Sequence, residues 1–443
     1  MIGEYFKLSH RQTSIKIECM AGLTTFLTMA YIIFTNPDIL SETGMDREAL
    51  IAVTCIISAV ATISVGLFAN APIAMAPGMG LNAFFAYSLV LGDKVPWETA
   101  LGVVFLSGLF FWILSLLGLR KKLVEAIPPS LVSAISVGIG LFITFIGLKN
   151  LGVIVQGTEA TLVKAGQLKA TVLIGMFGLI IMLFLEITKT KGALLVGIIF
   201  STVLAAILGY IPKPEQWITS NLNLSKVALR LDIIGALKWS LFGSIFTLMF
   251  IDMFDSVGTL VACCHQANMV NEKNKIKGLG MLLGLDAVAT MVGALLGTST
   301  TTAYIESAAG IEEGGRTGLT SIITGILFLL ALVFVPIVET VPRYAAAPAL
   351  IMVGLFMMKE VKKIDFTDLS EAFPSFIIMV MIALSYSIST GLAFGFISFT
   401  MMKIISGKIR DVKPAMWIIA FFSLLFLTLE QMPNLVERIK SLF

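Results

Sequence analysis

Five carboxylates lie within stretches of this sequence that are apolar enough to cross a membrane: Asp252, Asp255, Asp286, Glu306 and Glu186. A charged side chain at the centre of a bilayer costs roughly 2.5–3.5 kcal/mol on insertion scales, so such acids are candidates for function. Glu186 lies near a span end beside Lys189, and we interpret it as structural. Asp252 and Asp255 are three residues apart, and Thr259 follows four residues later, which places all three on one face of a helix. We predict that Asp255 and Glu306 bind a substrate, with Asp252 and Thr259 in supporting positions.

The same acids could carry a proton. Two carboxylates that face one small cavity repel each other, which favours retention of a proton by one of them near neutral pH. A proton symporter needs such a group. The proton-coupling candidates are Glu306, Asp255 and Asp286, although Asp286 is equally consistent with a structural role. The competing interpretation for each acid is a buried hydrogen bond that ties two helices together.

The composition identifies the class of protein. Of the 443 residues, 57% are apolar and 13% are charged, and the mean hydropathy is +0.95. A soluble fold of this length would need more charge to cover its surface, and a disordered chain would be poorer in apolar residues. We therefore predict a multi-pass protein of the cell membrane, surrounded by lipid. The net charge of +3 gives no reason to expect a nucleic-acid partner.

Metal and nucleotide chemistry have little support in the sequence. The chain contains two histidines, and its four cysteines have no metal-ligand spacing. Cys263, Cys264 and His265 are adjacent, so on a helix their side chains point in different directions. No phosphate-binding loop of the form GxxxxGK[ST] is present, which argues against ATP-driven transport by this chain. We expect no metal, no cofactor and no enzymatic activity.

The basic residues predict how the chain crosses the membrane. About fifteen apolar segments run from residue 17 to residue 430. If the N-terminus is cytoplasmic and each segment crosses once, the basic clusters all face the cytoplasm. These clusters lie at residues 120–122, 189–191, 273–277, 359–363 and 403–413. The last segment, 414–430, breaks this agreement, so either it is interfacial or one earlier segment does not cross.

An internal repeat links the two halves of the chain. The sequence Ala-Val-Ala-Thr occurs at residues 59–62 and again at residues 287–290, which is 228 residues later. Because seven apolar segments precede residue 215, the second copy would start in the opposite orientation. This arrangement predicts an inverted repeat, which many secondary transporters use.

Each copy of the repeat is followed by a segment that cannot form a regular helix. Residues 73–91 contain a proline and two glycines within four positions, and residues 297–310 contain five consecutive hydroxyl residues. Paired interruptions at matching positions are the best sequence indication of a substrate site at a repeat interface. Because 306 − 82 = 224 is close to the repeat offset, we expect Asn82 to lie close to Glu306. The alternative is that both segments are ordinary loops.

Several long motifs resemble those of AzgA-like purine permeases, a branch of the nucleobase–cation symporter-2 group. They are Gly22–Phe34 with Asn36-Pro37, Ala76–Phe85, Asp252–Leu260, Gly297–Ser307 and Gly314–Thr320. The motifs occur in order over nearly the whole chain. Where uracil permeases of the wider group have a histidine four residues after the first acid, this chain has Thr259.

The resemblance implies an all-α membrane protein with about fourteen transmembrane segments in a seven-plus-seven inverted repeat. The repeats would cover residues 17–215 and 236–406, after a cytoplasmic stretch 1–16, with an extracellular linker 216–235 between them and a C-terminal segment 407–443. A core domain would comprise about 17–119 and 236–339, and a gate domain about 129–211 and 345–430. The third and tenth spans would each contain a short strand, around Gly78–Asn82 and Thr298–Thr302, and the two strands would be antiparallel.

The implied substrate is a purine base, imported together with a proton. In the family, one carboxylate on the eighth span and one on the tenth hold the base, and the motif register assigns these to Asp255 and Glu306. Phe84 or Phe254 could stack on the flat ring. The full set of predicted substrate-binding residues is Asp255, Glu306, Asn82, Gly80, Phe84, Thr25 and Thr302.

Two alternatives remain at this point. An inorganic-anion or carboxylate transporter could use the same fold, but two acids in the site would repel an anion. An intramembrane aspartyl protease would use two acids, but its Gly-x-Gly-Asp motif is absent, since Asp286 follows Gly284-Leu285. The sequence does not distinguish adenine, guanine and hypoxanthine as substrates, and a homodimer is compatible with it.

Overall fold

The computed structural model describes residues 2–117, 127–158, 163–211, 217–218, 223–238, 241–269, 276 and 278–431. The basic residues at 120–122, 273, 275 and 277 lie outside these ranges, as do parts of the linker 216–235 and the residues after 431. The remaining predictions can be compared with the structure.

Helices account for most of the described chain. In the first half they are α1 (Ile2–Tyr5), α2 (Ile15–Met29), α3 (Ile32–Leu40), η1 (Ser41–Thr43), α4 (Arg47–Ser64), η2 (Val65–Ala69), α5 (Met79–Ala83), η3 (Phe84–Gly92), α6 (Trp97–Leu116), α8 (Pro129–Leu151), α9 (Ala170–Ile187), α10 (Ala193–Ile207), η4 (Leu224–Lys226) and α11 (Ile233–Ala236). In the second half they are α12 (Phe242–Gln266), α13 (Leu279–Leu296), α14 (Ser307–Glu312), α15 (Gly318–Ala331), η6 (Leu332–Phe334), α16 (Val335–Glu339), α17 (Arg343–Met357), η7 (Met358–Lys363), α18 (Leu369–Ser385), α19 (Ile388–Ile405), η8 (Ile409–Asp411) and α20 (Pro414–Gln431).

Polar caps define where several of these helices begin. The side chains of Ser14, Asp46, Thr317 and Asp368 each accept a backbone N–H from the first turn of α2, α4, α15 and α18, respectively. Such caps satisfy amide groups that have no partner within the helix. Asp368 also accepts from Lys408 at 2.8 Å, and this hydrogen bond lowers the pKa of the Asp368 carboxyl.

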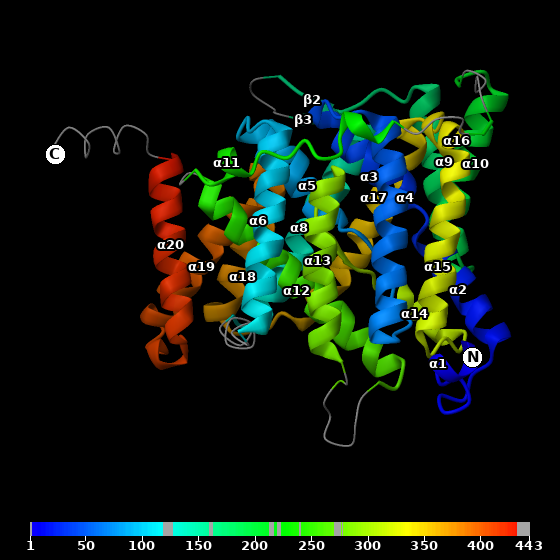
Figure 1. Ribbon diagram of the computed structural model, residues 1–443. Helices are drawn as coiled ribbons and strands as arrows, with labels where there is room; N and C mark the ends of the chain where they lie inside the picture. Colours follow the sequence, from blue (N-terminus) through cyan, green and yellow to red (C-terminus); the bar gives the residue numbers. More distant parts are fainter. Residues whose placement is uncertain are drawn as a thin grey trace.

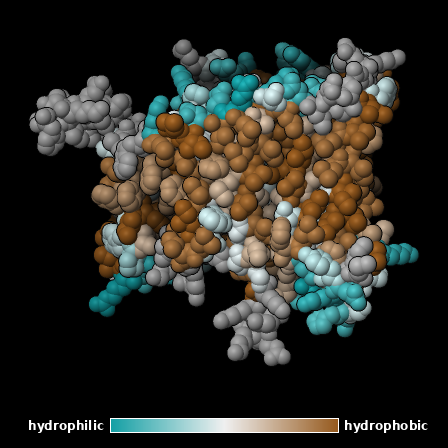
Figure 2. Space-filling view, in the orientation of Figure 1, coloured by the Kyte–Doolittle hydropathy of each residue, from teal (hydrophilic) through white to brown (hydrophobic). Residues whose placement is uncertain are grey.

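The helices form a bundle with an apolar belt. Ten helices in the described ranges are long and apolar enough to cross a membrane, and four shorter apolar helices accompany them. Most of them run in a similar direction, with α1 at one end of the bundle and β2 and β3 at the other (Figure 1). Hydrophobic residues cover the middle of the visible face, and hydrophilic residues gather above and below it (Figure 2). The structure is therefore that of a multi-pass, mostly helical membrane protein, as predicted.

Two short strands from distant parts of the chain pair at the centre of the fold. Strand β1 (Met75–Pro77) is antiparallel to β4 (Thr301–Ala303), and Ala76 lies opposite Thr302. The two interrupted spans with antiparallel strands are thus confirmed, but their bounds differ from those predicted. The first strand ends before Gly78, because residues 79–83 turn into α5, and the second begins three residues later than expected. A second pair, β2 (Ile154–Gln156) with β3 (Val163–Ala165), was not predicted.

The threonine of each Ala-Val-Ala-Thr repeat holds one of the central strands. The Thr62 hydroxyl donates to the carbonyl of Met75 at 3.0 Å and accepts from the amide of Met75 at 2.9 Å. The Thr290 hydroxyl makes the same two contacts with Thr301, at 3.0 and 3.2 Å. The two copies are separated by nearly the same number of residues: 290 − 62 = 228 for the threonines and 301 − 75 = 226 for the strand residues that they contact. The repeat found in the sequence is therefore a repeat of structure.

The helices separate into two groups by their packing. One group, here called the strand bundle, contains β1 and β4 together with α2–α6 and α12–α15; within it α15 packs on α2 and α4, and α13 packs on α6. The other group, here called the outer bundle, contains α8–α10 and α17–α20; within it α17 packs on α8 and α9, and α18 packs on α19 and α8. The two groups meet along α5, α8, α12 and α19.

Candidate functional site

A cavity of about 420 Å³ lies where the two bundles meet. The strand bundle contributes residues next to both central strands and one face of α12, and the outer bundle contributes α8, α17 and η7. Its polar lining includes Tyr31, Ser136, Asp255, Thr259, Tyr304, Glu306, Glu360 and Lys363. Its apolar lining includes Met79, Leu81, Ile135, Ile139, Phe250, Ile251, Phe254, Val353 and Phe356.

Glu306 reaches the cavity because β4 ends three residues before it. The chain then turns into α14, and Glu306 is the residue immediately before that helix. The Tyr31 hydroxyl donates to Glu306 Oε1 at 2.7 Å. A carboxylate can accept about four hydrogen bonds, so Glu306 can still accept N–H donors from a bound molecule.

Asp255 faces the same cavity from α12. Its residue is exposed, whereas Asp252, one turn earlier on the same helix, is 1% exposed. The Thr302 hydroxyl lies 3.4 Å from Asp255 Oδ2, with the geometry of a long hydrogen bond. Thr302 belongs to β4, so the strand that leads to Glu306 also contacts Asp255. The cavity therefore presents two acids that are both connected to β4.

Five residues that the sequence analysis named for the site line this cavity: Asp255, Glu306, Gly80, Thr259 and Phe254. Gly80 is needed there because a Cβ atom at this position would lie 2.6 Å from Ile139 Cγ2 on α8. Such a distance is too short for unstrained packing. Thr302 contacts Asp255 without being part of the lining.

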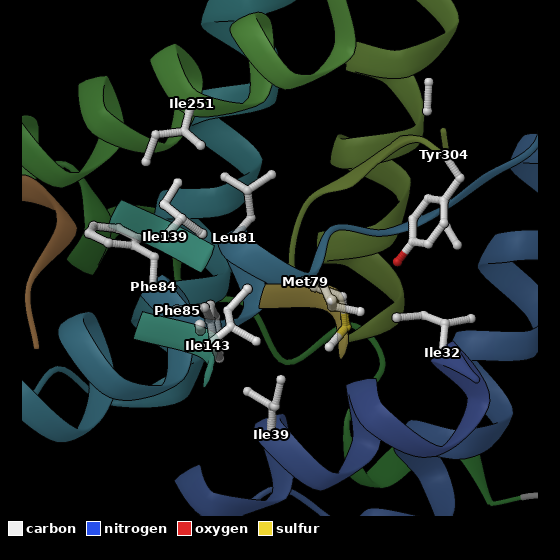
Figure 3. Packing of buried hydrophobic residues seen from close by; sticks show 14 of the residues in the cluster. Ile32, Ile39, Met79, Leu81, Phe84, Phe85, Ile139, Ile143, Ile251 and Tyr304 are labelled. Carbon is white, nitrogen blue, oxygen red and sulfur yellow. The ribbon is translucent and has the colours of Figure 1, made fainter. Parts of the chain in front are cut away.

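Three other predicted substrate-binding residues lie away from the cavity. The Asn82 side chain is fully buried and accepts a hydrogen bond from Ser299. Phe84 is buried in the apolar core, beside Ile139 and on the far side of the view from Tyr304 (Figure 3). Thr25 is buried, with no hydrogen-bond partner for its hydroxyl.

Asp252 and Asp286 are also outside the cavity, and both are buried. Thr290 donates to Asp252 Oδ2 at 3.1 Å, and Ser256 donates to Asp286 Oδ2 at 2.6 Å. These bonds link α12 to α13. The described residues contain no group of three or more His, Cys, Asp or Glu side chains that could hold a metal ion.

The sequence analysis did not assign Tyr31, Tyr304 or the outer-bundle side of the cavity to the site. Tyr31 lies within the motif Gly22–Phe34, and a tyrosine in an apolar span needs a partner for its hydroxyl, which was the available signal. Apart from Ser136, the lining residues of α8 and α17 are ordinary apolar side chains. Nothing in their type distinguishes them from membrane-facing residues.

A second, larger cavity of about 680 Å³ lies between α12, α19 and α20. Its lining is mostly aromatic and aliphatic, including Phe242, Phe246, Phe396, Phe422 and Phe426. Asp93 is its single acid. Because paired hydrogen-bonding groups are what orient a small polar ligand, the smaller cavity with Asp255 and Glu306 is the better candidate site.

Comparisons with known proteins agree with this architecture. A family described as the permease family matches residues 16–394. Adenine permease AdeP of Escherichia coli (strain K12) is 41% identical, over 96% of this chain and 95% of the relative. Guanine/hypoxanthine permease PbuG of Bacillus subtilis (strain 168) is also 41% identical, over 96% of this chain and 99% of the relative. These relatives confirm the resemblance to AzgA-like purine permeases and the prediction of a transporter rather than an enzyme.

A solved structure supports the fold. The transmembrane domain of BicA, a bicarbonate transporter of a cyanobacterium, superimposes with a TM-score of 0.65 at 17% sequence identity. The match covers 84% of this chain and 96% of that domain. At this identity the likeness concerns the fold alone, and it confirms the expected inverted-repeat architecture.

Proposed function

Because the chain belongs to the permease family, we propose that it imports a purine base together with a proton, and that the base binds in the cavity between Asp255 and Glu306. The observation that carries the proposal is the presence of two carboxylates in one cavity of about 420 Å³, both connected to β4. Relatives that are named for adenine and for guanine/hypoxanthine share about two fifths of the sequence identically.

The lining suits the chemistry of a purine. A purine has N–H donors along its edges and two apolar faces. Asp255 and Glu306 can accept N–H groups at the edge, and hydrogen bonds to charged groups are the stronger ones. Phe250, Phe254 and Tyr304 supply aromatic surface for the faces. Asn82, Phe84 and Thr25 then act indirectly, by supporting the segments that form the cavity.

Transport requires the cavity to open alternately to the two sides of the membrane. We propose that the strand bundle is the core domain and the outer bundle the gate domain. In the present conformation the cavity would be open to the cytoplasm. One end of the cavity is lined by Glu360 and Lys363 of η7, in the predicted cytoplasmic cluster 359–363. On the predicted external side, Arg343 at the start of α17 forms an ion pair with Glu42.

Proton coupling follows from the same acids. Two carboxylates that share a small cavity and have no basic partner favour retention of a proton by one of them. Asp255 and Glu306 share such a cavity, and no ion pair to either is present in the described ranges. Purine and proton would bind together because a proton on one acid reduces the repulsion between them.

An inorganic-anion or carboxylate transporter is the remaining alternative, since the fold is shared with a bicarbonate transporter. Two acids in the cavity oppose it, because an anion would meet like charge. The described lining holds one lysine, Lys363, at the cytoplasmic end, away from the strands.

Uptake by proteoliposomes tests the proposal. Purified protein would be given labelled hypoxanthine, with or without an inward pH gradient, and unlabelled adenine, guanine, uracil and bicarbonate would be added as competitors. We expect accumulation that depends on the pH gradient and competition by purines alone. Accumulation that survives a protonophore but needs sodium would contradict proton symport, and competition by bicarbonate would contradict the substrate.

A further inference from the structure

Asp252 and Asp286 form a pair of acids that the proposed substrate site does not use. Both are fully buried between α12 and α13, and Oδ1 of each has no hydrogen-bond partner. In the described part of the chain neither forms an ion pair with Lys, Arg or His. Besides interacting with each other, the two acids interact with one further titratable group among the described residues. This group is Asp255, which is also an acid.

This environment is unfavourable for two negative charges. A buried ionised carboxylate needs a counter-charge or a full set of hydrogen-bond donors. Here Asp252 receives one hydroxyl, from Thr290, and Asp286 receives one, from Ser256, with the backbone amide of Ala303 as a further nearby donor. One proton on the pair removes the repulsion between them and supplies the donor that the pair lacks.

Thr290 connects this pair to β4. Its hydroxyl has a single proton but faces two acceptors, Asp252 Oδ2 at 3.1 Å and the Thr301 carbonyl at 3.0 Å. The Thr301 amide meanwhile donates to the same hydroxyl oxygen at 3.2 Å. Thr290 cannot donate to both acceptors at once.

The proton state of Asp252 decides between the two acceptors. If Asp252 is protonated, it donates to Thr290, and Thr290 is free to donate to the Thr301 carbonyl. If Asp252 is ionised, it accepts the hydrogen bond from the Thr290 hydroxyl, and the buried Thr301 carbonyl loses its donor. Both arrangements use the same heavy atoms, so rotation of the hydroxyl proton is sufficient to change the hydrogen bonding of β4.

We propose that the Asp252–Asp286 pair is a protonation site outside the substrate cavity, and that Thr290 transmits its proton state to β4. The next residue of the strand, Thr302, contacts Asp255, and the strand leads to Glu306. The backbone amide of Ala303, also in β4, lies near Asp286. The proposal rests on proton-coupled transport and adds a second protonation site to the acids of the cavity.

The first repeat provides a natural control. Thr62 holds Met75 with the same pair of bonds, but no carboxylate in the described residues competes for its proton. The position that corresponds to Asp286 is Ser58, since 286 − 58 = 228. The pair of hydrogen bonds between a threonine and a strand, here called the strand clamp, is therefore common to both repeats, whereas the acids belong to the second.

Two measurements, equilibrium exchange and accumulation, distinguish a failure of this proposal from a failure of the proposed function. Asp252→Asn keeps the shape, and its amide donates to Thr290 as a protonated carboxyl would. We expect equilibrium exchange of labelled hypoxanthine at close to the wild-type rate, and accumulation driven by a pH gradient lower by roughly tenfold or more, because the coupling is lost. Wild-type accumulation with wild-type pH dependence in this variant would overturn the inference alone. Absence of accumulation in the wild-type protein would instead overturn the proposed function.

The relay is tested by threonine variants in both repeats. Thr290→Val removes the hydroxyl, and Thr290→Ser retains it. We expect loss of the pH dependence of accumulation in the first and its retention in the second. Thr62→Val loses the equivalent clamp and should keep the pH dependence. Equal pH dependence in Thr62→Val and Thr290→Val would contradict the relay.

Infrared difference spectroscopy on purified protein gives a readout without transport. We expect a protonated-carboxyl band that changes with pH in the wild type and that is shifted or lost in Asp286→Asn. This variant serves if Asp252→Asn does not fold. A carboxyl band that is unchanged in Asp286→Asn would show that the pair is not a protonation site.

Discussion

The two repeats place a similar helix, threonine and strand beside the cavity, but they differ in the side chains that they contribute. In the first, Thr62 holds β1, Ser58 lies one turn earlier on α4, and the strand leads to Gly80. In the second, Thr290 holds β4, Asp286 lies one turn earlier on α13, and the strand leads to Glu306. Gly80 and Glu306 differ by 226 residues, the offset of the paired strands.

This difference assigns separate roles to the two halves. The first repeat brings its backbone close to α8, which a glycine allows, and the second repeat supplies the acids. Two similar repeats can therefore bind an asymmetric ligand, because the second offers carboxylates to one edge and the first offers close apolar contact on the other side. The predictions below change one side of this comparison at a time.

The largest effect is expected on the acidic side, at Glu306. Glu306→Gln keeps the shape but removes the charge and one acceptor. We expect purine affinity to fall about ten- to a hundredfold, because a hydrogen bond to a charged group contributes about 1.5–3 kcal/mol. Scintillation proximity binding on purified protein measures this. Glu312→Gln, six residues later at the exposed end of α14, is the matched control. Equal affinity in wild type and Glu306→Gln would refute the site.

The two acids of α12 should differ. Asp255→Asn is expected to weaken purine binding by about tenfold, whereas Asp252→Asn should change it by less, because Asp252 does not reach the cavity. Dissociation constants of both variants, measured at one pH, decide the order. A greater loss of binding in Asp252→Asn would mean that α12 presents the other acid to the ligand.

Much of this arrangement was predictable from the residues. The repeat of Ala-Val-Ala-Thr located the two interrupted segments, the family resemblance implied the strands within them, and the cost of buried charge marked Asp255 and Glu306 as candidates. Helical spacing placed Asp252 and Asp255 on one face, but it does not say which neighbouring helix each meets. Burial of Asp252 against Thr290 depends on how α13 packs on α12, and that is a tertiary contact.

Other parts could not be predicted for similar reasons. The hydrogen bond that Asn82 accepts from Ser299 did not follow from its place in the repeat, because it depends on how α5 packs beside the second interrupted segment. Phe84 has the aromatic ring that a purine site would need, but it lies in the core. Residue type indicates what a side chain can do, whereas the helix rotation decides where it points.

The glycine side of the comparison is tested by Gly80→Ala. The added Cβ would lie 2.6 Å from Ile139 Cγ2, so the strand bundle and α8 must separate. Overpacking of this kind costs about 1–3 kcal/mol, and we expect transport about fivefold slower. Initial uptake rates measure the effect. Ile139→Ala in the same chain should restore much of the rate, and a wild-type rate in Gly80→Ala alone would count against the close approach.

The smallest effect is expected at the contact between the bundles on the predicted external side. Arg343→Gln removes the ion pair with Glu42 and the 3.3 Å hydrogen bond to Ser41. Exposed ion pairs contribute about 0–1 kcal/mol, so the apparent KM on the predicted external side should change by no more than about fivefold. Lys226→Gln breaks a similarly exposed pair with Asp46, inside the strand bundle, and should leave the KM unchanged. Identical results for both variants would show that the Arg343 contact does not bias the conformation.

A structure with bound purine tests the central claim most directly. Cryo-electron microscopy of the purified protein with saturating hypoxanthine should show the base in the cavity of about 420 Å³, within hydrogen-bonding distance of Asp255 and Glu306. The base should lie against the end of β4, with Gly80 and Ile139 on the opposite wall. Density for the base in the larger apolar cavity between α12, α19 and α20, with the first cavity empty, would contradict the account.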